Sequence, residues 1–231
     1  MIHLAIITAF AGAIFLFTGT LASVISYNNL NIVPYSFANH FVSELGWTKA
    51  SRTAWLFNWS LVVGTIAFLP MMIALGRHIR TRLGYVAVGF GLCAMLAASC
   101  VGVLPMGNLR PHLWAALIFF LAWFMTTVLF TLAFCPYWNP KPSRSMVASG
   151  MLCCLFCLAF FVFPKDSLAR AIQQVGSGTF QRPHIWWLAV MEWCVVLSSV
   201  VWASTVVSVL WRNRLSRIEE HKIGRLKGRE G

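Results

Sequence analysis

The feature that most constrains this chain is a series of six apolar segments, each long enough to cross a membrane as a helix. We place them at residues 4–27, 54–75, 84–105, 112–135, 145–163 and 185–211. A spanning helix needs about 20 apolar residues, because the hydrocarbon core is about 30 Å thick and each residue advances a helix by about 1.5 Å. The sequence therefore predicts an all-α fold, a polytopic integral membrane bundle of about six transmembrane helices.

The composition excludes an ordinary soluble domain. Hydrophobic residues make up 59% of the 231 residues and charged residues only 10%, whereas soluble domains contain about 45–50% and about 25%. The first segment is not typical of a signal peptide, because it lacks a basic start and its apolar run exceeds the usual length of about 7–15 residues. We expect one transmembrane domain at residues 1–211 and a basic cytoplasmic tail at residues 212–231.

The positive charges predict the side of the membrane on which each loop lies. If the N-terminus is inside, the outer loops hold six of the 18 Lys and Arg residues, namely Lys49, Arg52, Arg110, Lys165, Arg170 and Arg182. The excess on the other side fits the positive-inside rule, with both termini cytoplasmic in a plasma or inner membrane. Topology thus explains the net charge of +12, and we expect no nucleic-acid partner. Anionic lipid headgroups are a natural contact for the basic tail.

The outer loops contain two amphipathic patterns. In the first loop, Ser36 is placed to cap a helix formed by the segment FANHFVSELG that follows it. The apolar side chains of this segment recur at helical spacing at Phe37, Phe41 and Leu45. This pattern predicts a short helix. His40 and Glu44 are four residues apart at the edge of the apolar stripe, so they neighbour each other and are expected to face the protein. A second interfacial helix is predicted at residues 165–178.

Five ionisable side chains are predicted to gather at the outer membrane face: His40, Glu44, His112, Asp166 and His184. Three protein ligands plus a water make a hydrolytic zinc site, and the two Pro-His pairs at His112 and His184 open the fourth and sixth spans at their outer ends. However, the spacing matches no compact metal motif such as HExxH, and Asp166 is well placed to cap the helix that follows it. We therefore expect no cofactor, and we keep zinc, with His112 and His184 as candidate ligands, as an alternative.

Glu192 is the only carboxylate inside a predicted span. It lies two turns beyond His184, about 12 Å at about 1.5 Å per residue. An ionisable group in the membrane costs free energy and by default indicates a function, whereas a hydrogen bond between two helices is the structural alternative. Arg110 and Arg182 are candidate ion-pair partners, and Asn58, about one turn inside the second span, is a candidate polar neighbour.

Two segments, HFVSELGWTKASRTAWLFNWSLVVGT and VGVLPMGNLRPHLWAALIFF, resemble a family of six-span membrane proteins known as domain of unknown function 998. The family pattern is Ser-x-Leu-Gly after the first span, Phe-Asn early in the second, Gly-x-x-Pro ending the third and a His opening the fourth. It corresponds here to Ser43, Leu45, Gly46, Phe57, Asn58, Gly102, Pro105 and His112. Family members often have an acidic residue just after the proline, where this chain has Met106 and Gly107.

The resemblance covers roughly residues 5–135 and implies a six-helix fold with an outer polar cluster, but it implies no activity. The missing acidic residue removes one candidate ligand and makes a metal site harder to assemble. A more distant likeness to the DRAM and FRAG membrane families suggests lipid handling, as analogy only.

Three functions remain open on the sequence alone. The first, which we favour, is an integral membrane protein that binds a lipid or another small hydrophobic molecule near the outer leaflet, as a transporter-like or accessory protein. Its ligand-binding residues, at the polar end of a cavity, would be His40, Glu44, Asn58, His112 and Glu192. The second is a metal-assisted hydrolase or transferase that acts on a lipid headgroup. The third is a non-catalytic subunit of a larger membrane complex, so the expected partners are membrane lipids and, alternatively, other membrane subunits.

Overall fold

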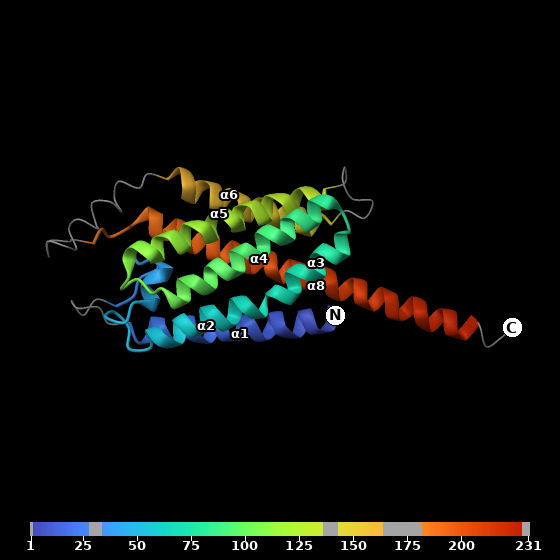
Figure 1. Cartoon of the computed structure of the whole chain (residues 1–231), viewed down its shortest axis with the longest axis horizontal. Coiled ribbons are helices and arrows are strands. Elements are labelled where there is room, and N and C mark those ends of the chain that lie inside the picture. Colours follow the sequence, from blue (N-terminus) through green and yellow to red (C-terminus); the bar gives the residue numbers. More distant parts are fainter. Residues whose placement is uncertain (1, 28–33, 136–142, 164–181, 228–231) are drawn as a thin grey trace.

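The protein is a bundle of membrane-spanning helices, as the sequence predicts. The computed structural model describes residues 2–27, 34–135, 143–163 and 182–227, with side chains beyond residue 212 described only for Arg214. The elements, in chain order, are α1 (Ile2–Ile25), the 3₁₀ helix η1 (Val42–Gly46), α2 (Ala54–Ala67), α3 (Leu69–Ile79), α4 (Arg82–Val103), α5 (Leu109–Phe134), α6 (Arg144–Val162) and α8 (Trp187–Lys227) (Figure 1). Within these described ranges, six helices are long and apolar enough to cross a membrane when α2 and α3 are counted as one span. The chain is an integral multi-pass membrane protein.

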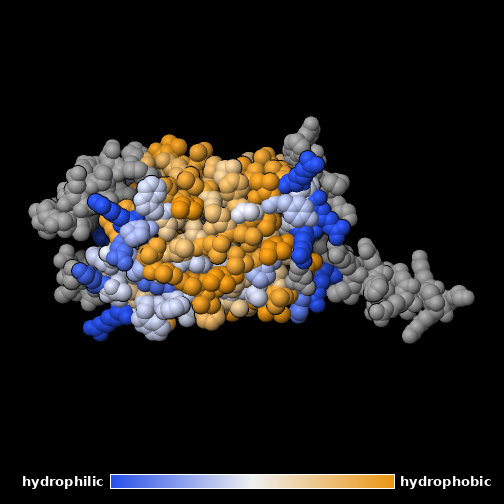
Figure 2. Space-filling view, in the orientation of Figure 1, coloured by the Kyte–Doolittle hydropathy of each residue, from blue (hydrophilic) through white to orange (hydrophobic). Residues whose placement is uncertain are grey.

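The helices run side by side along one long axis, and α1 begins at the end of the bundle where α8 leaves it (Figure 1). An apolar band covers the middle of the visible surface and polar residues mark both ends (Figure 2). We call one end the arginine end, because it holds Arg77, Arg80, Arg82, Arg144, Arg212 and Arg214. We call the opposite end, which holds Glu44 and Glu192, the glutamate end. That the arginine end is cytoplasmic stays a prediction.

The second span is broken in the middle, which the sequence did not predict. Pro70 lies in the first turn of α3 and has no backbone N–H to continue the hydrogen-bonding ladder of α2. The Thr65 hydroxyl donates to the Leu61 carbonyl at 2.6 Å one turn earlier. The span therefore bends at Phe68, between α2 and α3, while remaining one hydrophobic crossing.

Neighbouring helices approach closely where glycine removes the side chain. A Cβ atom built on Gly12 of α1 would lie 2.7 Å from the Gly64 carbonyl oxygen of α2. One built on Gly102 of α4 would lie 2.5 Å from the Asn58 carbonyl oxygen of α2. Small residues are typical of membrane helix interfaces, because packing rather than the hydrophobic effect holds helices together in lipid.

The helix predicted in the loop between α1 and α2, which we continue to call the first outer loop after its predicted side, is largely wrong. Only Val42–Gly46 is helical, as a 3₁₀ turn, and Phe37 is 56% exposed although Phe41 and Leu45 are buried. The Ser36 carbonyl instead accepts the amides of the third and fourth residues after it in a separate turn. The second predicted interfacial helix and Asp166 lie outside the described residues.

The predicted boundary between membrane domain and tail falls within a continuous helix. Helix α8 continues without a break from Trp187 to Lys227, and its hydrophobic part ends at Arg212. The helix packs on α6, α1 and α3 and so closes the bundle. Its first turns bring Glu192 and Trp193 beneath η1, which places the polar residues described next.

Candidate functional site

Glu44 is the centre of a buried polar cluster at the glutamate end. Its two carboxylate oxygens accept hydrogen bonds from the Phe41 amide at 2.9 Å and from the Tyr27 hydroxyl at 2.9 Å. The Arg182 guanidinium approaches the same carboxylate with two nitrogens, at 3.0 Å and 2.8 Å. A bidentate guanidinium–carboxylate pair is the strongest form of side-chain ion pair, so Glu44 fixes three separate chain segments.

The ion pair also identifies the partner of Arg182. The sequence offered Arg182 as a partner for Glu192, but among the described residues its ion pair is with Glu44. Arg182 also donates to the Asn39 carbonyl at 2.6 Å, and the Asn39 side-chain amide donates to the Pro183 carbonyl at 3.1 Å. These contacts fix the first outer loop to the segment that enters α8.

Glu192 holds the start of η1 from below. Its carboxylate accepts a hydrogen bond from the Val42 amide at 2.8 Å, and the side chain is buried. A carboxylate at the first turn of a helix satisfies amides that have no partner within that helix. The buried acid therefore has a structural role between α8 and η1, which is the alternative that the sequence left open.

His40 is completely buried, as the sequence predicts for a residue facing the protein. Its ring Nδ1 lies 3.2 Å from the Ser36 amide nitrogen and 3.3 Å from the Ser36 carbonyl oxygen, so Ser36 is its partner in either tautomer. Its Nε2 has no hydrogen-bond partner within the described part of the chain. Burial lowers the pKa of His40 below its usual value, and the nearby Arg182 lowers this pKa further.

Three aromatic residues enclose His40, and none of them was among the predicted site residues. The rings of Tyr27 and Tyr35 lie 5.0 Å and 5.1 Å from the imidazole, between centroids. The Trp193 indole donates to the Tyr35 hydroxyl at 3.1 Å, and that hydroxyl donates to the Phe41 carbonyl at 3.0 Å. Burial raises the pKa of both tyrosines, with Glu44 adding to the effect at Tyr27, so both remain neutral hydrogen-bond donors.

Asn58 joins the cluster from its edge. Its side-chain amide donates to the Gly46 carbonyl at 3.0 Å and so connects α2 to the end of η1. This contact also explains why η1 ends in a glycine, because a Cβ atom there would collide with the Asn58 side chain. Asn58 is thus a neighbour of the loop rather than a direct ligand of Glu192.

His112 is buried but belongs to a different contact. Its ring Nδ1 donates to the Leu104 carbonyl at 2.7 Å, which ties the start of α5 to the end of α4. His184 is exposed, and its backbone carbonyl accepts a hydrogen bond from Asn39. Within the described residues, no group of three or more His, Cys, Asp or Glu side chains is arranged to hold a metal ion. The two histidines offered as zinc ligands therefore have separate surroundings.

The arrangement also explains the short motifs that the sequence analysis singled out. Ser43, Leu45 and Gly46 belong to η1, Asn58 hydrogen-bonds its end, and Gly102 packs against the backbone of Asn58. His112 closes the neighbouring α4–α5 connection. The motifs are far apart in sequence, but they form one continuous set of contacts at the glutamate end.

The comparison with known families agrees with this set of contacts. Residues 9–209 match the family described as protein of unknown function (DUF998). The chain belongs to this family. The match extends beyond the roughly 130 residues on which the resemblance was recognised and includes the last two spans. No curated protein and no solved structure matches the chain, and the likeness to the DRAM and FRAG families stays a prediction.

Proposed function

We propose that this member of the DUF998 family binds a lipid or another small hydrophobic molecule at the glutamate end, in a transporter-like or accessory role. The observation that carries the proposal is Nε2 of His40, which is buried and has no hydrogen-bond partner among the described residues. More than nine in ten buried polar groups in proteins have a partner. A polar atom left without one costs about 1–3 kcal/mol.

The two acids of the cluster have structural explanations, whereas Nε2 of His40 and Oδ1 of Asn39 have no hydrogen-bond partner within the described part of the chain. Glu44 pairs with Arg182, and Glu192 accepts the Val42 amide. These bonds hold residues 40–44 in a fixed conformation at the glutamate end. A bound hydroxyl, amide or phosphate oxygen at His40 would complete the network, and the attached hydrocarbon would lie along the apolar band of the bundle (Figure 2).

The matched variants His40→Phe and His184→Phe test the proposal. The full chain is purified from membranes in mild detergent, and its retained lipids are quantified by mass spectrometry against the bulk membrane extract. We expect the wild type to retain one or a few lipid species above their bulk abundance. His40→Phe should lose this enrichment while the protein stays folded, because phenylalanine fills the same space without an unpartnered nitrogen.

His184→Phe is the control, because this histidine is at the same end of the bundle but exposed. It should retain the enriched species at the wild-type level. If wild-type protein retains lipids only in bulk proportion, or if both variants retain the same enriched lipids, the site at His40 does not bind them.

A further inference from the structure

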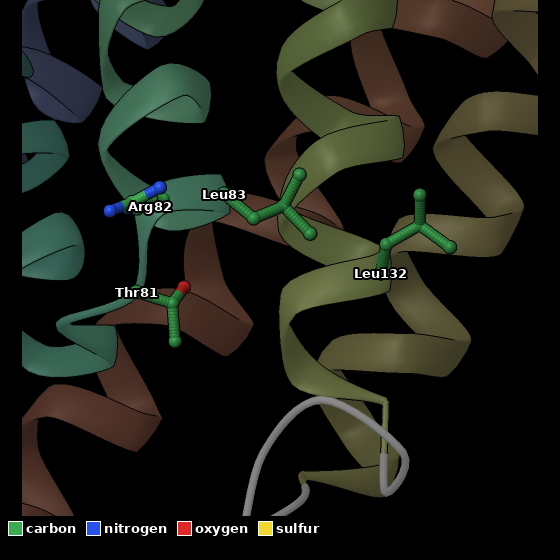
Figure 3. Close-up of a pocket in the computed structure, with 4 residues that line it drawn as sticks. All are labelled: Thr81, Arg82, Leu83 and Leu132. Atoms are coloured by element: carbon green, nitrogen blue, oxygen red, sulfur yellow. The ribbon is translucent and has the colours of Figure 1, made fainter.

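An open groove lies at the arginine end, far from the polar cluster. It has a volume of about 470 Å³ and is lined by Thr81, Arg82, Leu83 and Leu132. Leu83 extends from the first turn of α4 toward α5, whose Leu132 forms the other side (Figure 3). The volume is within the range of about 300–1,000 Å³ that is typical of small-molecule sites.

The groove combines an apolar floor with a positive rim. Leu132 is 42% exposed, so this part of the groove opens onto the surface that faces the hydrocarbon. Arg82 is exposed and, within the described part of the chain, no acceptor pairs with its guanidinium. Contact with an external anion would therefore break no hydrogen bond within the described protein.

The charge around the rim favours an anion. Arg77 and Arg80 precede Arg82 at the same end. The carboxylates whose side chains the structure describes, Glu44 and Glu192, are both at the opposite end of the bundle. The positive end of the α4 dipole adds to this field, because α4 begins at Arg82. The Thr81 hydroxyl already accepts the Gly84 amide at 3.1 Å as the helix cap, which leaves Arg82 as the free cationic group.

We propose that this groove binds one anionic phospholipid of the surrounding membrane. An acyl chain lies against Leu83 and Leu132, and the headgroup phosphate lies at Arg82. A lipid is the occupant that fits both halves, because an apolar floor open to hydrocarbon and a cationic rim at the polar boundary match the two parts of that molecule. Basic pockets between membrane helices recognise anionic headgroups in this way. The proposal is independent of ligand binding at the glutamate end.

The test uses the full chain in nanodiscs that contain equal amounts of phosphatidylglycerol and phosphatidylcholine. Native mass spectrometry counts the lipids that stay bound after release from the nanodisc. Arg82→Gln removes the rim charge, Leu132→Trp fills the apolar floor, and Arg212→Gln is the matched control for a charge at the same end. Circular dichroism and thermal unfolding check each variant, and Leu132→Phe replaces Leu132→Trp if the larger side chain prevents folding.

The wild type should retain one phosphatidylglycerol in preference to phosphatidylcholine. Arg82→Gln should reduce that preference about fivefold, the effect of one cationic side chain near a membrane surface. Leu132→Trp should reduce retention of both lipids, and Arg212→Gln should leave retention unchanged. Equal retention of the two lipids by wild type, equal losses in Arg82→Gln and Arg212→Gln, or unchanged retention in Leu132→Trp would each overturn the proposal.

Discussion

Replacing Glu44 by glutamine tests whether the buried ion pair holds the first outer loop onto the bundle. Glutamine has nearly the same shape, so the substitution removes charge and acceptor capacity without leaving a cavity. One amide oxygen can still accept from the Phe41 amide and one Arg182 nitrogen. The new NH₂ group would then face the Tyr27 hydroxyl and the second Arg182 nitrogen, which are both donors.

The expected loss follows from these contacts. Breaking a buried ion pair by removing one partner costs about 3–5 kcal/mol, because the other charge stays buried. Here the Arg182 side chain is 19% exposed whereas that of Glu44 is 4% exposed. Water therefore recovers part of the arginine's solvation, and the Tyr27 hydroxyl can rotate to accept from the new amide. We expect Glu44→Gln to lower the free energy of unfolding by about 2–4 kcal/mol.

The assay is equilibrium unfolding of the protein in mild detergent by graded addition of dodecyl sulfate, followed by tryptophan fluorescence. Arg182→Gln and the double variant complete a double-mutant cycle, which isolates the coupling between the two side chains. The sum of the two single-variant losses in the free energy of unfolding should exceed the loss in the double variant by at least about 1 kcal/mol.

Two results would refute the reasoning. A loss of less than about 0.5 kcal/mol in Glu44→Gln would place the carboxylate among ordinary exposed ion pairs, whose contribution is about 0–1 kcal/mol. Strictly additive losses in the cycle would show that Glu44 and Arg182 act separately, so the ion pair would not hold the loop.

Three further predictions concern particular contacts. Gly102→Ala should lower the free energy of unfolding by about 1–3 kcal/mol, because its Cβ would press on the Asn58 carbonyl; Gly89→Ala on the same helix meets nothing within 4 Å and should raise stability by up to about 1 kcal/mol. Because the pKa of His40 is lower in the folded chain than in the unfolded chain, the unfolded chain takes up the proton at a higher pH as the solution is acidified. Wild-type stability should therefore fall as pH drops below about 6.5, and His40→Phe should show a shallower fall. His112→Phe leaves the Leu104 carbonyl, just after α4, without its side-chain donor and should lower the free energy of unfolding by about 1–3 kcal/mol in the same assay.

The positions of the spans could be predicted because they depend on local composition. Each membrane helix satisfies its backbone hydrogen bonds within itself, so a run of apolar residues is enough to locate it. The predicted second span at residues 54–75 corresponds to Ala54–Ile79 in the structure, and the predicted fifth at 145–163 to Arg144–Val162. The bend at Pro70 was missed, because the hydrophobic run continues through it.

The candidate site could be predicted only in part. His40, Glu44 and Glu192 stood out as ionisable residues next to or inside apolar segments, and all three are buried at one end of the bundle. Tyr27, Tyr35 and Trp193 carried no comparable signal, since aromatic residues are common throughout the chain. The weak helical pattern of the first outer loop was misleading, because hydrogen bonds that backbone amides donate to Glu44 and Glu192, rather than helix propensity, set its conformation.

The sequence by itself determined that this chain has six apolar segments long enough to cross a membrane and that few ionisable groups lie within them. The tertiary structure decided which of these groups meet. Arg182 is 138 residues from Glu44 in the sequence. Glu192 is 150 residues from Val42, whose backbone amide donates a hydrogen bond to it. Such partners depend on how the first outer loop folds back onto the start of α8, and no local pattern encodes that approach. The same approach left Nε2 of His40 buried without a hydrogen-bond partner among the described residues, which is the observation on which the proposed function rests.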